Sequence, residues 1–400
     1  MLTYRDVFNI DDGDTIPPSD PTSENFYNLI KSEQFNVKST SDDLSYKSNI
    51  SPEEKQVIDV EPMNIDSQQL VVQNKRSTVD NKQQVVSQPQ WKLSKVIANA
   101  HEGWVRSCTM DPVSNRWYVT GGSDATIKVW DLATSQIKAT LTGHIMGVRS
   151  LKVSSKFPYL FSGSEDKTVR CWDLERTNSK AGCQIRDYHG HVGGIYAMDL
   201  HPELDILCTG GRDSVIRVWD IRSRTEIMLL SGHRADITSI SCSASDPQIV
   251  SSSMDSTIRL WDIRKATTQL AITHHSKSIR SMVSHPNEMT MCSADSAGQF
   301  KQWVLPRGDL LNEFATTNDD SKIVNSLAIN PSNDTLFAGY DDGRMEFYDY
   351  KSGNLVQSTT SKPVPGTPET TIYASTFDKS GSRLITCEGD KSIKIWVEEG

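Results

Sequence analysis

Histidine, aspartate and hydroxyl side chains recur along this chain of 400 residues in an order that could serve proton transfer. After His144, for example, Ser162 and Asp166 follow at short range. A hydroxyl, an imidazole and a carboxylate are the groups of a hydrolase triad, in which the imidazole activates the hydroxyl as a nucleophile. The adjacent pair His274 and His275 suggests a metal site instead, but no carboxylate or cysteine stands at ligand spacing from it.

The three groups recur together with a tryptophan, once per repeat, and this recurrence argues against catalysis. The histidine lies 28 residues before the tryptophan in four repeats and 29 before it in the first, and the aspartate lies six before it. The four complete sets are His101, Thr120, Asp124 and Trp130; His144, Ser162, Asp166 and Trp172; His191, Thr209, Asp213 and Trp219; and His233, Ser251, Asp255 and Trp261. A catalytic site does not recur through a chain, whereas an architectural network does. We therefore predict that the four groups satisfy one another inside a low-dielectric blade.

The elements that position these sets are short alternating strands with Gly, Asp and Ser turns, which begin at residue 91. Each repeat ends on an aromatic anchor, at positions 130, 172, 219, 261, 303, 348 and 396, with spacings of 42, 47, 42, 42, 45 and 48. A repeat of this length with a W-D signature is typical of one four-stranded propeller blade. The sequence therefore predicts an all-β, seven-bladed WD-repeat β-propeller over residues 91–400.

The repeat pattern departs from its consensus in the last three blades. Blade five has Ala297 where the aspartate belongs, with Asp295 displaced by two, and its bond set is expected to be broken. Blade six has no histidine, Ala338 in place of the hydroxyl and Tyr348 as the anchor. Blade seven keeps its hydroxyl, aspartate and tryptophan but again has no histidine. We expect this half of the ring to depend more on packing and to be less rigid.

The last blade lacks an outer strand of its own. Only a few residues follow Trp396, while residues 91–98 precede the first loop histidine and belong to no blade. Because closed β architectures avoid an unpaired edge, residues 91–98 should join blade seven as its fourth strand and close the ring.

Residues 1–90 have a different composition and are predicted to be a disordered acidic N-terminal region. They hold 15 acidic against 8 basic residues, whereas residues 91–400 hold 36 against 34, and all nine tryptophans lie beyond residue 90. Such a segment buries too little apolar area to offset the entropy of ordering. Residues 23–31 and 51–54 carry short-helix signals. Both a solvated linker and segments that fold on a partner remain open for them.

Several functional classes are excluded by what the sequence lacks. No apolar run is long enough to span a membrane, and the first residues lack the pattern of a secretory signal. Seven irregularly spaced cysteines favour reduced thiols over disulfides or zinc. The motifs of hydrolases, P-loop proteins, dinucleotide-binding enzymes and zinc proteases are missing. We expect neither an enzyme nor a cofactor, and a nearly neutral propeller is a poor match for nonspecific nucleic-acid binding.

The function should then lie on a surface, and the channel mouth is the candidate. The residue five positions after each loop histidine and the residue one position before each turn aspartate border this mouth. One further tryptophan, which is not an anchor, precedes the first of these positions. The predicted rim residues are Trp104, Arg106, Arg149, Tyr196, Arg212, Met254 and Arg280. Arginine and aromatic residues are typical of protein-binding hot spots. A solvated rim whose arginines pair with neighbouring acids is the competing interpretation.

Longer strings add a family resemblance over roughly residues 91–400. They are Trp91-Lys92-Leu93, the stretches 101–106, 156–162, 188–196 and 199–202, and the stretch 382–394. Together they resemble the pleiotropic-regulator family of spliceosomal WD-repeat proteins. Ala100 departs from the usual glycine before His101, and residues 178–184 form an insertion in blade two.

The resemblance implies a fold and a function. It implies that the four-residue sets act structurally, and that the protein is a nuclear, non-enzymatic scaffold of the Prp19-associated (NineTeen) complex of the spliceosome, with cytoplasmic localisation also open. The implied partners are spliceosomal proteins, notably a Myb-type cell-division-cycle splicing factor, with peripheral RNA contact at most, no membrane and one copy per hetero-complex. A ubiquitin-ligase substrate receptor or a signalling scaffold is the alternative.

Overall fold

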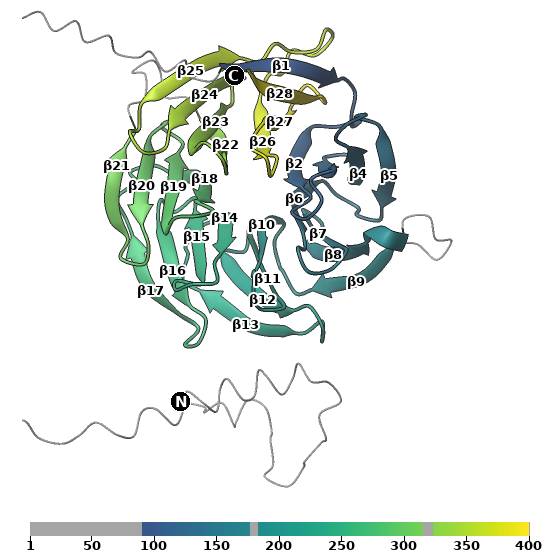
Figure 1. Cartoon of the computed structure of the whole chain (residues 1–400). Helices are drawn as coiled ribbons and strands as arrows, with labels where there is room; N and C mark the ends of the chain where they lie inside the picture. The colour runs from purple at the N-terminus through teal and green to yellow at the C-terminus, as the bar shows by residue number, and fades with distance from the viewer. Residues whose placement is uncertain (1–89, 177–182, 315–322, 400) are drawn as a thin grey trace, which may run out of the picture. The chain divides into compact units, whose positions relative to one another are not determined.

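The structure is a computed structural model that describes residues 90–176, 183–314 and 323–399. Its strands form seven four-stranded antiparallel sheets, and these surround a central channel as the blades of a propeller (Figure 1). The predicted seven-bladed β-propeller is therefore confirmed. The prediction of a disordered acidic region with short helices in residues 1–90 falls almost wholly outside the described residues, and the boundary at residue 90 stays a prediction.

In the first six blades, four consecutive strands run from the channel outward. Blade one has β2 (Val105–Met110), β3 (Trp117–Gly122), β4 (Thr126–Asp131) and β5 (Ile137–Thr142). Blade two has β6 (Val148–Val153), β7 (Tyr159–Ser164), β8 (Thr168–Asp173), the short 3-10 helix η1 (Leu174–Arg176) and β9 (Gln184–His189). Blade three has β10 (Ile195–Leu200), β11 (Ile206–Gly211), β12 (Val215–Asp220) and β13 (Glu226–Ser231).

The remaining blades follow the same order, apart from the outer strand of the last one. Blade four has β14 (Ile237–Cys242), β15 (Ile249–Ser253), β16 (Ile258–Asp262) and β17 (Thr267–Ile272). Blade five has β18 (Ile279–Ser284), β19 (Thr290–Asp295), β20 (Phe300–Val304) and β21 (Asp309–Glu313). Blade six has β22 (Val324–Ile329), β23 (Thr335–Tyr340), β24 (Arg344–Asp349) and β25 (Leu355–Thr360). Blade seven has β26 (Ile372–Phe377), β27 (Arg383–Glu388), β28 (Ile393–Glu399) and β1 (Gln90–Ile97).

The strand β1 closes the ring. It pairs antiparallel with β28, with Trp91 opposite Glu398, and Figure 1 shows the blue β1 beside the yellow β28. Gln357 of β25 also holds this strand, because its side chain accepts a hydrogen bond from the Trp91 amide at 2.8 Å and donates one to the Trp91 carbonyl at 3.0 Å. The Trp91 ring stacks on Phe347, with ring centroids 5.4 Å apart. Closure thus joins segments from the two ends of the described chain.

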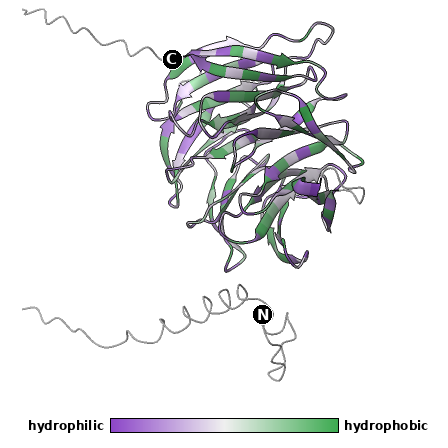
Figure 2. Ribbon diagram, turned by 45° about the vertical axis from the view of Figure 1, so that its right-hand side comes forward, coloured by the Kyte–Doolittle hydropathy of each residue, from purple (hydrophilic) through white to green (hydrophobic). Residues whose placement is uncertain are grey.

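The hydrophobic core is divided into clusters that lie between adjacent blades. In one of them Trp219 of blade three is packed with Phe161 and Tyr188 of blade two, and the aromatic anchor of each other blade likewise packs against the blade before it. Hydrophobic and polar residues alternate along the strands in Figure 2, as expected of strands whose successive side chains point to opposite faces. Each anchor therefore joins two blades.

Candidate protein-interaction surface

The four-residue sets fasten the loop before each blade to its second and third strands. In blade three, His191 Nδ1 lies 2.6 Å from Asp213, and His191 Nε2 lies 2.7 Å from the Thr209 hydroxyl. The indole nitrogen of Trp219 donates to the same hydroxyl at 2.8 Å. The sets beginning at His101, His144 and His233 are connected in the same way. The structure therefore brings all four predicted sets together as architectural networks.

The chemistry of one set fixes the direction of its hydrogen bonds. An ionised carboxylate can only accept, so the Nδ1 of His191 donates to Asp213 and its Nε2 accepts from Thr209. Burial alone would raise the pKa of Asp213, but the hydrogen bonds that it accepts, first of all the one from His191, outweigh burial and the pKa lies below its ordinary value. In this arrangement the hydroxyl donates to the imidazole and receives the indole N–H. The Thr209 hydroxyl therefore has a structural role and is not free to attack a substrate.

Blade five retains its bond set, and the expectation that it is broken was wrong. His275 Nδ1 lies 3.3 Å from Asp295, while its Nε2 lies 2.7 Å from Ser293, which also receives the Trp303 indole at 2.8 Å. Asp295 is the last residue of β19, so the carboxylate reaches the histidine from the strand end instead of from the turn at Ala297. In blade one the corresponding strand end is Gly122.

Residue 122 is a glycine for a steric reason. A Cβ at Gly122 would lie 2.6 Å from the Nδ1 of His101 and 2.4 Å from a carboxylate oxygen of Asp124. In blade one the histidine and the carboxylate of the turn thus occupy the space that a side chain at the strand end would need, whereas blade seven has an acid at both positions, Glu388 and Asp390.

Blade six replaces the histidine set with buried phenols around a carboxylate. Glu346 is almost fully buried and accepts hydrogen bonds from the hydroxyls of Tyr340 and Tyr348. Tyr340 occupies the strand end of β23, the position of Asp295 in blade five. Burial raises the pKa of Tyr348 above its ordinary value. The aromatic anchor is thus satisfied by an acid from its own strand.

Blade seven carries a buried ion pair in place of the histidine. Lys394 Nζ lies 2.6 Å from Glu388, 2.6 Å from the Ser361 hydroxyl and 3.4 Å from Asp390. The four side chains are buried. Thr386, at the predicted hydroxyl position, donates to Glu388 at 3.3 Å and receives the blade's indole N–H at 3.0 Å. The histidine network is therefore replaced in blades six and seven, whereas the lower rigidity expected of the last three blades stays a prediction.

The rim residues are positioned by a β-bulge in the first strand of every blade. In blade one, Val105 pairs with Gly122 and Ser107 with Gly121, so that Arg106 is left without a partner in the register. The residue before each bulge is a fully buried valine or isoleucine. A bulge re-aims a side chain. The seven bulged residues are Arg106, Arg149, Tyr196, Thr238, Arg280, Asn325 and Tyr373.

Two of these residues were missed by the sequence analysis. Asn325 and Tyr373 lie in the blades that have no loop histidine, so counting from a histidine could not reach them. The signal that would have found them is the buried aliphatic residue at the start of the inner strand, Val324 or Ile372, followed directly by the bulged position.

Arg106 is clamped between two aromatic rings. Its guanidinium carbon lies 4.7 Å from the ring centroid of Trp104 and 5.1 Å from that of Tyr373, and its Nε donates to Ser123 at 2.9 Å. Burial, and next the charge of Arg149, lower the pKa of Arg106. Trp104 therefore acts as one wall of an arginine clamp.

The second clamp joins blades two and three. The guanidinium carbon of Arg149 lies 4.9 Å from the ring centroid of Tyr196, and the Arg149 Nε donates to Glu165 at 2.6 Å. This ion pair agrees with the interpretation of a rim whose arginines pair with acids. Such partly exposed pairs contribute little to stability. The pair nevertheless fixes the direction of the guanidinium.

The other three predicted rim residues differ in their surroundings. The Nε of Arg280 is buried and has no hydrogen-bond partner within the described ranges. Met254 is half-buried, and Arg212 is exposed in the hairpin between β11 and β12.

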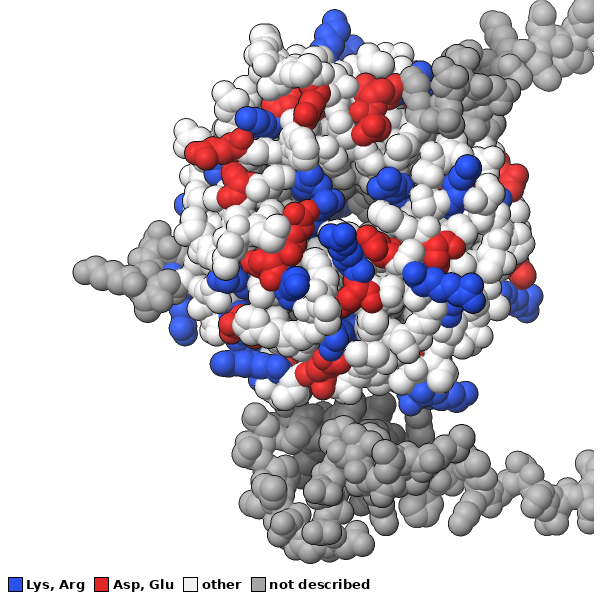
Figure 3. All heavy atoms as spheres, turned by 180° about the vertical axis from the view of Figure 1, so that it is seen from behind, with Lys and Arg blue, Asp and Glu red and all other residues white. Residues whose placement is uncertain are grey.

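Most of the rim residues line one cavity of about 890 Å³ in the channel. The predicted residues in its wall are Arg106, Arg149, Tyr196, Met254 and Arg280. Trp104 and Arg212 lie outside the wall, although Trp104 contacts Arg106. Asp236 and Asp341 also belong to the wall. On the face seen in Figure 3, basic and acidic side chains are mixed around the channel opening.

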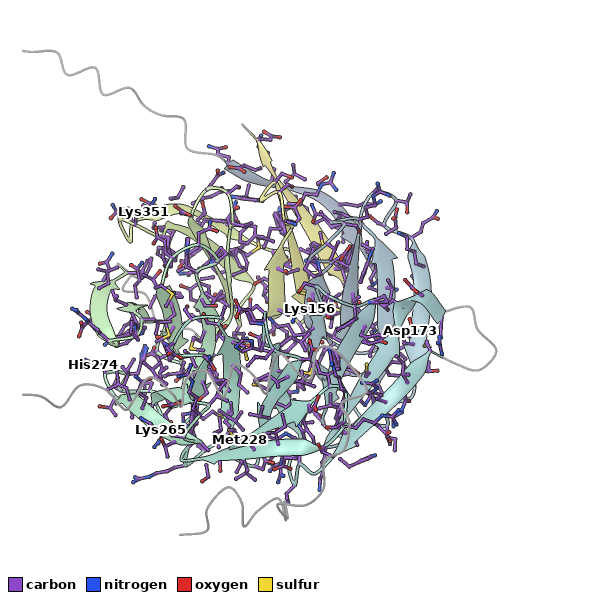
Figure 4. All side chains as sticks on the ribbon, turned by 60° about the horizontal axis from the view of Figure 1, so that its bottom comes forward. Lys156, Asp173, Met228, Lys265, His274 and Lys351 are labelled. Atoms are coloured by element: carbon purple, nitrogen blue, oxygen red, sulfur yellow. The ribbon has the colours of Figure 1, made fainter. Side chains whose placement is uncertain are left out.

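Three lysines on the opposite face of the ring are paired with acids. This face consists of the loops that follow the first and third strands of the blades, and it carries Lys156, Lys265 and Lys351, which are labelled in Figure 4. Lys351 lies 2.9 Å from Asp334, Lys156 3.3 Å from Asp205 and Lys265 3.7 Å from Asp262. The mouth differs from this face in its arginines, which are stacked on aromatic rings.

Other kinds of site find no support in the described ranges. There, no group of three or more His, Cys, Asp and Glu side chains is placed to hold a metal ion. The helical part of the described chain includes no segment long and apolar enough to cross a membrane.

Comparison with known proteins gives consistent results. A sequence model of the family described as "WD domain, G-beta repeat" matches residues 91–131, 135–173, 182–220, 224–262, 309–349 and 360–397. The stretch between the fourth and fifth matches covers most of blade five, whose carboxylate is displaced to Asp295. The missing match thus falls on the blade whose sequence departs while its bond geometry persists.

Curated relatives extend the similarity over the whole chain. The pre-mRNA-splicing factor PRP46 of Debaryomyces hansenii is 64% identical, with 100% of this chain and 95% of the relative covered. PRP46 of Candida albicans is 52% identical, with 98% of each chain covered. The protein pleiotropic regulator PRL2 of Arabidopsis thaliana is 45% identical over 77% of this chain and 62% of its own length.

Proposed function

The chain belongs to the WD-repeat family that includes the PRP46 splicing factors and the plant pleiotropic regulator, and from this membership we propose that it is a non-enzymatic scaffold in pre-mRNA splicing. The observation that carries the proposal is the 64% identity along the full chain to a relative named as a pre-mRNA-splicing factor. The protein then works in the nucleus, as a subunit of the Prp19-associated complex. Its expected partners include a Myb-type cell-division-cycle splicing factor.

The surface proposed to hold these partners is the channel mouth. Two arginines there are each stacked on aromatic rings, and such pre-ordered side chains lose little entropy when a partner binds. Arginine and aromatic residues dominate binding energy at protein interfaces. The polar groups of the repeats support the absence of enzymatic chemistry, since each histidine and hydroxyl in the four complete sets is already bonded.

Native affinity purification, followed by mass spectrometry and RNA analysis, tests the splicing role. Recovery of splicing proteins with small nuclear RNAs supports it, whereas recovery of a G-protein γ subunit or of cullin components would replace it with a signalling or ubiquitin-ligase role.

The docking surface is tested by Arg149→Ala combined with Tyr196→Ala. This double variant should stay folded yet weaken assembly with splicing proteins by about 2 kcal/mol or more, because it removes one entire clamp. Added salt should weaken binding to wild type as well, since screening reduces charge attraction. Arg307→Ala, at an exposed site in the loop before β21 on the opposite face, is the matched control. A folded double variant with wild-type partners would move the docking site to another face.

A further inference from the structure

The two stacked arginines present unused hydrogen-bond donors to the cavity. Arg106 donates through its Nε to Ser123, and Arg149 through its Nε to Glu165. Their terminal nitrogens make no hydrogen bond to any residue of the described ranges. An arginine held by its Nε and by a ring face keeps a fixed direction, and its two terminal nitrogens then form a fork of matched donors.

The two stacked arginines lie near each other in the cavity wall, and of the two only Arg149 forms an ion pair, with Glu165, within the described ranges. The charge of Arg149 lowers the pKa of Arg106, so the two guanidinium groups lie close enough to repel each other. Arg280 also belongs to the cavity wall, but it lies on β18 of blade five, across the channel from β2 and β6 (Figure 1).

We propose that Arg106 and Arg149 receive the phosphate group of a phosphorylated serine or threonine in a partner protein, an inference that rests on the docking function proposed above. A phosphate carries about −1.5 to −2 charges at neutral pH and three strong acceptor oxygens. It therefore fits two neighbouring guanidinium groups. A single carboxylate carries one charge and is matched by one arginine fork.

The surroundings favour a protein segment over RNA as the source of the phosphate. Ile145 and Val192 directly follow the loop histidines of blades two and three, and 83% and 72% of their surfaces are exposed. They stand four residues before Arg149 and Tyr196, and such exposed apolar side chains suit apolar residues beside a phosphorylated one. Asp236 and Asp341 in the cavity wall would repel a polyanion, whereas one isolated phosphate avoids them.

Binding of defined peptide pools to the purified full-length chain tests the proposal. One pool carries a central phosphoserine between randomised residues, and matched pools carry serine or aspartate at that position. The phosphoserine pool should be retained about tenfold more than the serine pool and clearly more than the aspartate pool, because only phosphate offers two charges. Retained peptides should be enriched in Ile, Leu or Val beside the phosphoserine. Arg106→Ala with Arg149→Ala should reduce retention to the level of the serine pool, while Arg307→Ala should not.

Three results would overturn the inference. Equal retention of the aspartate and phosphoserine pools would identify a carboxylate site, and stronger binding of a single-stranded RNA of random sequence would identify a nucleic-acid site. Unchanged retention by the arginine double variant, with an unchanged melting temperature, would place the phosphate elsewhere.

Phosphatase treatment of an extract before the native purification separates this inference from the docking function. If partners survive phosphatase but are lost with Arg149→Ala and Tyr196→Ala, docking stands and the phosphate is excluded. If they survive both, the docking function fails as well.

Discussion

Blades three and seven meet the same structural need with opposite electrostatics. In blade three, His191 joins Asp213 to Thr209 and so ties the incoming loop to the strands. In blade seven the incoming loop is tied by Ser361 and a buried ion pair between Lys394 and Glu388. In both blades the indole N–H of the anchor tryptophan donates a hydrogen bond to a threonine hydroxyl. What the propeller requires at each blade is therefore a satisfied polar link, and the residue types are interchangeable.

The two kinds of polar link should differ in the stability that is lost when one member is removed. The histidine set is built around one carboxylate and one imidazole, and removing the carboxylate leaves only neutral groups unsatisfied. Removing one partner of a buried ion pair leaves a charge in a low-dielectric interior, which is considerably more costly. Blade seven also depends on a strand from the other end of the described chain, whereas blade three is made of consecutive strands. Three consequences of this difference can be measured on stability, and a fourth on pH dependence.

The largest effect is expected from removing β1. A chain that lacks residues 1–85 should fold as a propeller, while one that lacks residues 1–98 should expose the edge of β28 and aggregate, because an unpaired edge pairs with other chains. Thermal unfolding and size-exclusion chromatography distinguish the two truncations. Equal stability and equal monomer yield would show that β1 is dispensable.

The next largest effect is expected at the buried ion pair. Lys394→Met keeps much of the side-chain volume but leaves Glu388 and Asp390 without their cation, and it should cost about 3–5 kcal/mol of unfolding free energy. The double variant Lys394→Met with Glu388→Gln should recover part of this loss, because it removes one of the two stranded acids. Denaturant unfolding measures both variants. A loss for Lys394→Met no greater than that for a histidine-set variant would contradict the comparison.

A smaller loss is expected for the histidine sets, including the one in blade five. Asp213→Ala should cost about 1–3 kcal/mol by leaving the imidazole of His191 without its acceptor. Asp295→Ala should cost a similar amount, since Asp295 supplies the same bond from the strand end. Ala297→Ser, at the former turn position, should cost less than either. Unfolding of Asp213→Ala at the wild-type denaturant concentration would refute the hydrogen-bond account of the repeats.

The sequence predicted the fold because the determinants of the fold recur. The number of blades follows from the anchor spacing, and the four complete sets follow from fixed offsets to each tryptophan. The sets of blades five to seven could not be predicted by the same offsets, since Asp295, Tyr340 and Glu388 all lie at the end of the second strand. Their polar atoms reach the network from a different point of the backbone. Only the strand ends show that these three positions are equivalent.

The rim was predicted in part, for a related reason. Arg106, Arg149 and Tyr196 stand at a fixed distance after a loop histidine, and the structure places all three in the cavity wall. Counting residues from the loop histidine gives no information about the β-bulge that directs these side chains into the cavity. It also could not reveal Tyr373, which has no histidine before it and yet forms one wall of the Arg106 clamp. Contacts between blades one and seven depend on ring closure, which local spacing does not encode.

The smallest effect concerns the pH dependence of stability, which has opposite signs in the two kinds of blade. Burial raises the pKa of Glu388 to about 7, against the opposing charge of Lys394. The folded state thus holds a proton that the unfolded state has already released, so stabilisation is fully present below the ordinary pKa of glutamate and is lost as pH rises through 7. Asp213 has a lowered pKa, and its contribution is instead lost in acid, as pH falls below the ordinary pKa of aspartate.

Between pH 6 and pH 8 the unfolding free energy of wild type should therefore fall by about 1 kcal/mol relative to that of Glu388→Gln. Denaturant unfolding of both proteins at several pH values measures this difference, in which the titration of the histidines cancels. Parallel profiles would mean that Glu388 stays ionised beside Lys394, and that blade seven, like blade three, is stabilised by an ionised carboxylate throughout this range.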